Sequence, residues 1–409
     1  MDFGDNASGD SKPQLPCYIL LSGNIGDDVK RLLLRSYRQS VDMPTGVDLV
    51  YRDILWGDMP EGKMELPLVK VLEESGCGCK RTSWEDDATL FAVRCGYTWN
   101  HAHDDAGGFA LYDRGKALLI DSGSCPYGDK LYHDYYTTGA AHSIVTADEK
   151  GQVFENTYLG SKFSGTLTRL DTADGLEIWC ADATGPISNI YQRNYRHFIM
   201  LDDETTVILD ELRAYEEHTY RWQLHYNGEA TLEKDALHID NGTSRMTVRT
   251  VSPENCRAEL RDGYRCVENK PELKNTIYYG SDVILPKQKY LCVEYPERTR
   301  VAHFLHALLL NEAESAEVES LSGTDWCGVK ITRGSTVYKV YYNLRADGRN
   351  MHINTNNCID GFETDAYMLV LCEKEGVCTW QTVCASYLRR DGESLYESFM
   401  KRDAYGVND

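Results

Sequence analysis

Short strand-like segments recur along most of this 409-residue chain and constrain its fold more than any other feature. From Lys63 to about Val383, runs rich in aromatic and β-branched residues alternate with turns of Gly, Asp and Asn, as in DATLFAVRC, HFIMLDDETTVILDEL and TVYKVYYNL. Such runs at short intervals are typical of antiparallel sandwiches. The sequence therefore predicts a mainly β protein with a large antiparallel β-sandwich.

The two ends of the chain depart from this pattern. GDDVKRLLLRSYRQS, residues 26–40, sets apolar residues among basic ones and predicts a helix, and VDLVYRDILW, residues 47–56, predicts a second short one. The segment after the last strand-like run is charged, and we expect a surface extension or a short helix there. We assign residues 1–62 to a helical segment, 63–390 to the sandwich and 391–409 to a C-terminal tail.

One motif, NHAHDDAGGFALYDRGKALLIDSG, carries most of the chemistry, and its DRG segment, residues 113–115, predicts the turn of a hairpin with Gly in the left-handed conformation. Side chains alternate across a strand, so His101 and His103 project together, and neighbouring strands can bring Asp121 and the more distant His142 beside them. Two imidazoles and a carboxylate at one point commonly hold zinc. The pattern predicts a zinc site of His103, Asp121 and His142. The alternative is that each is a hydrogen-bonded polar residue at a strand end.

Candidate acid–base groups surround this motif. His101 shares a face with His103 and is a candidate acid, base or anion-neutralising group, or else a surface histidine. The segment DKLYHDYYTTGAAHS adds Tyr132, Tyr135 and Tyr136. A tyrosine acts as acid or base where a nearby cation or metal lowers its pKa, but aromatic loops also plug cores.

A second group of residues predicts anion binding. Arg193 and Arg196 in QRNYRHF and His225 in RWQLHYN are expected to form a cationic, aromatic-lined patch that holds a carboxylate or sulfate. The alternative is that these residues lie at strand ends and bind no ligand.

Charge and composition exclude some partners. A formal net charge of −21 argues against nucleic-acid binding, and the same field repels any other polyanion. The chain lacks an apolar run near about 18 residues, so we expect no membrane span. Its 14 scattered cysteines and polar N-terminus, which is no secretory signal peptide, favour the cytoplasm.

Several motifs together carry a family resemblance. His-x-His-x-Asp-x-Gly-x-Phe, residues 101–109, precedes LYDRGKALLIDSG and a tyrosine-rich segment ending in AHS. RTSWEDDATLFAVRCG lies upstream, and YRHFIML, DELRAYEEHTYRW and TDAYMLVL lie downstream. This set resembles the C-terminal half of heparinase II/III-like polysaccharide lyases over residues 60–390. The family usually has AHN where this chain has AHS.

The resemblance implies a fold and an activity. The family, much of it bacterial and periplasmic or exported, joins an (α/α) toroid to an antiparallel β-sandwich. It cleaves uronate-containing glycans, such as heparin, heparan sulfate or alginate, by β-elimination in the cleft between the two. Residues 1–62 then correspond to the end of the toroid. The toroid normally supplies an Asn, a His and a Tyr that this chain lacks, so an upstream toroid is expected in a full-length form.

The resemblance also implies roles for single residues. His101 corresponds to a sandwich histidine near the substrate, and one of Tyr132, Tyr135 and Tyr136 to a substrate-side tyrosine. The ligands of a mainly structural zinc correspond to His103, Asp121 and His142.

The expected function is therefore that of a polysaccharide lyase, or of the C-terminal part of one, acting on an acidic polysaccharide or oligosaccharide. Two alternatives remain. One is a non-catalytic carbohydrate-binding sandwich with a structural metal. The other is a hydrolase that uses a zinc-bound water.

Overall fold

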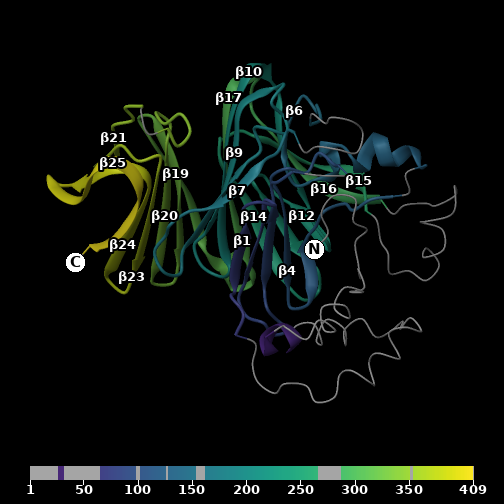
Figure 1. Cartoon of the computed structure of the whole chain (residues 1–409), viewed down its shortest axis with the longest axis horizontal. Coiled ribbons are helices and arrows are strands. Elements are labelled where there is room, and N and C mark those ends of the chain that lie inside the picture. The colour runs from purple at the N-terminus through teal and green to yellow at the C-terminus, as the bar shows by residue number, and fades with distance from the viewer. Residues whose placement is uncertain are drawn as a thin grey trace.

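The computed structural model describes residues 26–31, 65–97, 102–125, 128–152, 162–265, 287–350 and 353–408. Antiparallel strands dominate these ranges, and Figure 1 shows their sheets stacked side by side. The predicted fold class, a mainly β antiparallel sandwich, is confirmed. Two hydrophobic cores lie between successive sheets, so the sandwich has three layers.

The first layer contains two smaller sheets that meet at a bridge between Leu119 and Tyr226. One has the order β1 (Val69–Leu72), β2 (Cys77–Arg81), β3 (Leu90–Arg94), β4 (Gly108–Asp113), β5 (Lys116–Leu119). The other has the order β15 (Arg257–Tyr264), β16 (Lys287–Glu294), β11 (Tyr220–His225), β6 (Val145–Ala147).

The central layer is an eight-stranded sheet whose middle strands are buried on both faces. Phe198 and Met200 pack against the first layer, whereas Ile199 between them packs against the third. A strand covered on both faces needs a continuous apolar run, which explains the segment HFIML. The order is β12 (Glu229–Leu232), β13 (Ala236–Asp240), β14 (Arg245–Ser252), β17 (Thr299–Leu310), β10 (Thr205–His218), β9 (Tyr191–Met200), β8 (Glu177–Asp182), β7 (Thr166–Arg169).

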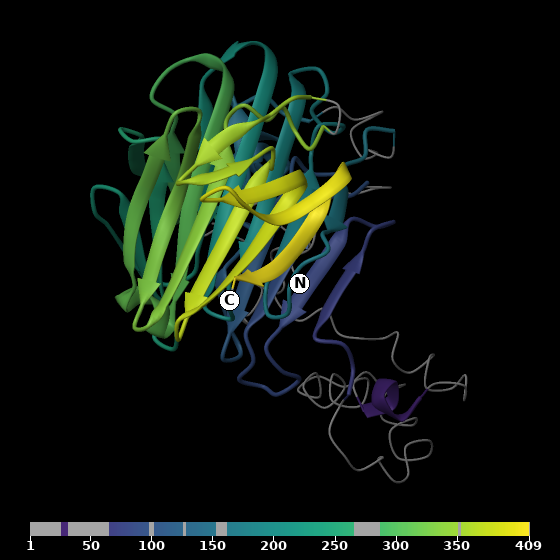
Figure 2. The ribbon, with the colours of Figure 1, turned by 90° about the vertical axis from the view of Figure 1, so that its left-hand side faces the viewer.

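The outer layer is a second large sheet, drawn in green and yellow in Figure 2. Its strands follow the order β18 (Glu317–Gly323), β19 (Trp326–Arg333), β20 (Thr336–Asn343), β23 (Met368–Lys374), β24 (Val377–Arg390), β22 (Phe362–Thr364), β21 (Asn357–Ile359).

The prediction of a C-terminal extension or short helix is wrong. That segment forms β25 (Glu393–Asn408), which pairs with β24 and curls over the outer sheet (Figure 2). Tyr396 and Ala404 on β25 pack against a cluster that includes Trp380 and Leu388. The strand carries many charges because its other side faces solvent.

Helical structure is sparse in the described ranges. Residues 27–31, within the first predicted helix, form a single helical turn. The second predicted helix, residues 47–56, lies outside the described residues. Three further short turns are η1 (Tyr132–Tyr136), η2 (Gly139–Ala141) and η3 (Asn311–Ser315). None of the described helices is long and apolar enough to cross a membrane.

The predicted hairpin of the motif is confirmed, and it positions the candidate site. β4 and β5 are joined through Arg114 and Gly115, whose φ angles of 50° and 75° are both left-handed. Gly adopts this conformation without steric cost, which is why a DRG turn suits the connection. The chain leaves β5 directly into the segment that carries Asp121.

Candidate functional site

Asp121 and His142 meet inside the first layer. The Nδ1 atom of His142 donates to Oδ2 of Asp121 over 2.6 Å, and the two residues are 0% and 4% exposed. A backbone hydrogen bond of 3.2 Å from Ser122 N to Ala141 O ties the two segments together. The loop after β5 and the turn before β6 are thus fixed against each other at these side chains.

His103 lies beside this pair. Its ring centroid is 5.3 Å from that of His142 and 6.0 Å from that of Tyr132. A hydrogen bond of 3.0 Å from Asp104 N to Thr137 O holds the His103 segment against the end of η1. The structure therefore brings the three predicted metal ligands into one buried neighbourhood.

The three side chains are of the types that bind zinc, but they are not arranged around a common metal position. Within the described ranges, no group of three or more His, Cys, Asp or Glu side chains is arranged to hold a metal ion as it stands. Nevertheless, Nε2 of His142 is buried and has no hydrogen-bond partner among the described residues. Asp121 holds the opposite ring nitrogen, as carboxylates do for histidines that bind metals. Imidazole and carboxylate donors of this kind are ordinary zinc ligands.

Burial and neighbouring carboxylates set the charge state of the pair. Burial opposes a proton on His142, but the charge and hydrogen bond of Asp121 outweigh it, and the pKa of His142 lies above its usual value. For Asp121, burial disfavours the charged carboxylate and raises its pKa, and the opposing effect of His142 does not cancel this rise. Asp105, which follows His103 in the same motif, pairs with Arg94.

The three candidate tyrosines lie on η1 and are all buried. A substrate-side role for any of them requires η1 to shift. Tyr135 packs closely against β15: a Cβ atom at Gly263 would lie 2.2 Å from its hydroxyl oxygen. Burial raises the pKa of Tyr135 above its usual range.

Tyr135 heads a chain of hydrogen bonds with a defined direction. Nε2 of His225 lies 3.0 Å from the carbonyl oxygen of Ala140, which only accepts, so Nε2 carries the proton. Nδ1 of His225 then accepts from Ser122 Oγ at 3.1 Å, and Ser122 Oγ accepts from the Tyr135 hydroxyl at 3.2 Å. Tyr135 is therefore held as a proton donor to Ser122, which follows Asp121 in the chain. The sequence carries no signal for Ser122.

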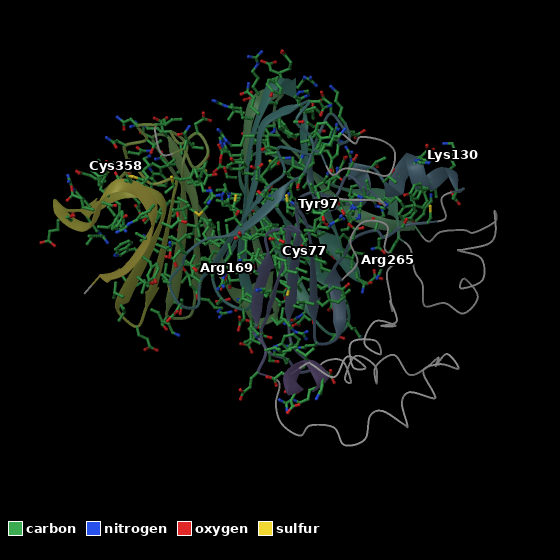
Figure 3. All side chains as sticks on the ribbon, viewed as in Figure 1. Cys77, Tyr97, Lys130, Arg169, Arg265 and Cys358 are labelled. Atoms are coloured by element: carbon green, nitrogen blue, oxygen red, sulfur yellow. The ribbon has the colours of Figure 1, made fainter. Side chains whose placement is uncertain are left out.

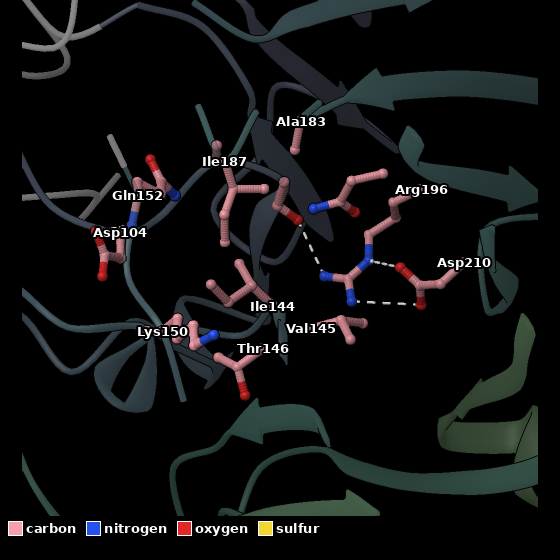
Figure 4. A pocket seen from close by; sticks show the side chains of 14 residues that line it. Asp104, Ile144, Val145, Thr146, Lys150, Gln152, Ala183, Ile187, Arg196 and Asp210 are labelled. Carbon is pink, nitrogen blue, oxygen red and sulfur yellow. Dashed lines mark hydrogen bonds and ion pairs between the residues drawn. The ribbon is translucent and has the colours of Figure 1, made fainter. Parts of the chain in front are cut away.

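The structure separates the residues predicted to bind an anion. His225 is buried in the first layer, with burial lowering its pKa to about 3. Arg196 is 3% exposed and lies against a small pocket, where its Nε donates to Asp210 over 2.6 Å (Figure 4). Arg193 pairs with Glu211 and Asp347 between the central and outer sheets. As placed, both guanidiniums are already neutralised by carboxylates.

The molecular surface near η1 lies at the end of the molecule opposite the outer sheet. Figure 3 marks this end by Lys130, just before η1, and Arg265, just after β15. His101 lies outside the described residues, so its predicted place near the substrate stays a prediction.

Comparison with known proteins agrees with this architecture. The family model described as "Heparinase II/III-like, C-terminal" matches residues 69–298. A heparin-sulfate lyase of Bacteroides stercoris is 32% identical over 127 residues, which are 30% of this chain and 19% of that protein.

Solved structures show the same fold. A heparan sulfate lyase, HepC from Pedobacter heparinus, superposes with a TM-score of 0.60 and 13% identity over 84% of this chain and 50% of its own. A heparinase III does so with a TM-score of 0.62 and 14% identity, over the same shares. The chain thus spans about half the length of these structures and a smaller part of the curated lyase.

The family match covers more than half of the chain and includes the strands and loops that carry His103, Asp121 and His142. This chain therefore belongs to the heparinase II/III-like family, in which it corresponds to the C-terminal domain.

Proposed function

We propose that this chain is a polysaccharide lyase, or the C-terminal part of one, that cleaves uronate-containing glycans such as heparin, heparan sulfate or alginate by β-elimination. The observation that carries the proposal is the meeting of His103, Asp121 and His142 beside η1 in a member of this family. Named relatives are heparin- and heparan-sulfate lyases, which makes a sulfated uronate glycan the first substrate to test.

The reaction requires three tasks of the protein. The uronate carboxylate must be neutralised, which acidifies the C5 proton; a base removes that proton; an acid protonates the leaving glycosidic oxygen. Stabilising the enolate-like intermediate is the largest demand. Of these tasks, we assign those performed by the β-sandwich to His101 and to one tyrosine of η1. Tyr135 positions the site through Ser122, which leaves Tyr132 and Tyr136 as the acid–base candidates.

We further propose that His103, Asp121 and His142 hold a zinc ion. When bound, zinc supplies positive charge that favours the deprotonated ligands and cross-links the segments that carry them. The hydrogen bond between Asp121 and His142 holds the loop after β5 against the turn before β6. The remaining catalytic groups are proposed to come from an upstream toroid.

A lyase assay tests the proposal. The chain, alone and joined to a family toroid, is offered a panel of uronate glycans, and the unsaturated uronate product is followed by its ultraviolet absorbance. Wild type with the toroid is expected to form product. His101→Ala is expected to lower the rate at least about 100-fold, the usual contribution of a general acid or base.

A matched control keeps the result specific. His238, on β13 in the central sheet, is 40% exposed at its side chain and contacts Thr247, so His238→Ala is expected to leave the rate unchanged. Absence of product on every glycan would refute the lyase assignment.

A second candidate is a carbohydrate-binding sandwich without catalysis. The burial of all three η1 tyrosines favours it, because no described tyrosine of that turn reaches the surface as it stands. This candidate predicts that glycans are retained by the chain with no new ultraviolet absorbance.

A further inference from the structure

One face of the four-stranded sheet in the first layer is polar. Residues paired across neighbouring strands share a face, and side chains alternate along each strand. Trp222 and Val293, which are paired, point into the core, so Arg221 and its partner Glu294 point the other way. The same alternation puts Arg261 on this polar face.

Two arginines of this face converge on one oxygen atom. The NH1 atoms of Arg221 and Arg261 lie 3.0 Å and 3.1 Å from Oε1 of Glu149. Each guanidinium is also anchored from its own sheet: Nε of Arg221 donates to Glu294 over 2.8 Å, and Nε of Arg261 donates to Glu259 over 2.7 Å. The anchors fix the guanidiniums so that their outer ends form a preformed cradle for an oxyanion.

Glu149, which fills this cradle, is held only loosely. It follows β6 in a turn where Asp148 and Glu149 have φ angles of 50° and 59°, a left-handed conformation that is costly for two successive non-glycine residues. Asp148 stabilises the turn by accepting from Thr219 N at 2.9 Å and from His218 Nδ1 at 2.8 Å. The Glu149 side chain is 60% exposed, and ion pairs at such sites contribute little.

The cradle is contiguous with the candidate site. Arg261 is paired with Tyr290 across neighbouring strands, and the Tyr290 ring stacks on that of His225 with centroids 4.7 Å apart. His225 in turn contacts Ser122, which follows Asp121 in the chain. Through these buried side chains the cradle is connected to the metal and tyrosine neighbourhood.

We propose that Arg221 and Arg261 form a subsite for a sulfate or carboxylate group of an acidic glycan, and that Glu149 occupies this subsite in the free protein. The inference rests on the proposed function for its substrate class. The whole chain repels polyanions through its net charge of −21, so fixed, convergent guanidiniums are needed to hold one. Displacing Glu149 from the cradle exchanges an internal carboxylate for the ligand's oxyanion.

A binding experiment tests the subsite without turnover. Affinities of the 409-residue chain for heparan sulfate fragments, and for unsulfated heparosan fragments of equal length, are measured at low salt. Glu149→Gln is expected to raise the affinity about tenfold by removing the competing charge, and Arg261→Gln to lower it about tenfold.

Arg257 provides the matched control. It lies on the same strand as Arg261 and bonds the same Glu259, but it is 76% exposed and makes no contact with Glu149 among the described residues. Arg257→Gln is expected to change the affinity less than twofold. Because the Glu149 side chain is exposed, Glu149→Gln remains informative even if Arg261→Gln fails to fold.

The outcomes separate the ligand groups and the two proposals. A response with both glycans assigns the subsite to a carboxylate, and a response with heparan sulfate alone assigns it to a sulfate. No gain in Glu149→Gln, or equal losses in Arg257→Gln and Arg261→Gln, would overturn the subsite. If the variants respond but no unsaturated product forms in the lyase assay, the subsite stands and the lyase assignment fails. If product forms and the variants do not respond, only the subsite fails.

Discussion

Two buried polar clusters in this molecule differ in how completely their hydrogen bonds are satisfied. The closed cluster lies between the central and outer sheets: Glu211 accepts from Arg193 at 2.9 Å, from Gly348 N at 3.0 Å and from the Tyr367 hydroxyl at 2.6 Å. The open cluster consists of His103, Asp121 and His142. There the buried Nε2 of His142 has no partner among the described residues.

An unpaired buried nitrogen alone does not mark a ligand site, because His197 and His306 also have them among the described residues. What distinguishes His142 is that Asp121 holds its opposite ring nitrogen, as carboxylates do for histidines that bind metals. A buried network in which each group is paired rigidifies its surroundings, whereas an unpaired buried nitrogen costs free energy that the fold must offset elsewhere. We therefore expect substitutions in the closed cluster to change stability alone, and substitutions in the open cluster to change metal and glycan chemistry.

The largest expected effect is on the closed cluster. Glu211→Ala leaves Arg193 without one of its two carboxylates and should cost about 3 kcal/mol of unfolding free energy, as removal of one partner of a buried ion pair does. Urea unfolding measures this loss. Glu216→Ala, at an exposed position of the same strand, is the control and should have little effect. A loss below about 1 kcal/mol for Glu211→Ala would show that the closed cluster is not structural.

Acid should destabilise both regions through buried neutral histidines. Burial lowers the pKa of His197, beside Tyr367, and of His225, beside Ser122, to about 3 each. In the unfolded chain each takes up a proton near pH 6.5, so the stability they contribute is present above about pH 6.5 and is lost as the pH falls toward 3.

Unfolding experiments across this pH window test the sign. In His197→Gln, the free energy of unfolding should fall less steeply with decreasing pH than in the wild type. The difference in slope should be up to about 1.4 kcal/mol per pH unit, because the variant takes up one proton fewer on unfolding. An acid slope identical to that of the wild type would contradict the neutral, buried state of this histidine.

The smallest expected effect concerns Tyr135. Tyr135→Phe removes one hydrogen bond, to Ser122, and should cost about 1 kcal/mol by urea unfolding. In the lyase assay it should retain product formation, in contrast to His101→Ala. If Tyr135→Phe abolishes product while its fold and stability are kept, Tyr135 is the acid–base group and its assignment as a positioning residue is wrong.

Local patterns in the sequence predicted the parts of the fold that depend on local physics. Alternation and turn residues predicted the hairpin through Arg114 and Gly115, and the continuous run around Ile199 matches a doubly buried strand. The motif also predicted that His103, Asp121 and His142 would meet, although strand alternation is not the reason, because all three lie in loops or turns beside the strands.

Features that depend on distant partners could not be predicted in this way. Arg193 and Arg196 have the same local sequence whether they bind a ligand or a carboxylate such as Asp347, far along the chain. The Ser122–His225 contact joins two separate loops, and neither carries a motif for it. The last strand was mistaken for a tail because its charges suit solvent, and only its pairing with β24 makes it a strand.

Metal analysis of the purified chain tests most directly whether the open cluster awaits a ligand. We predict about one zinc per chain, the stoichiometry of a single site, and near-complete loss of zinc in His142→Ala. Glu211→Ala, in the closed cluster, should keep its zinc. Wild-type protein that folds and binds no metal after equilibration with zinc, or a His142→Ala variant that binds as much as wild type, would contradict the account.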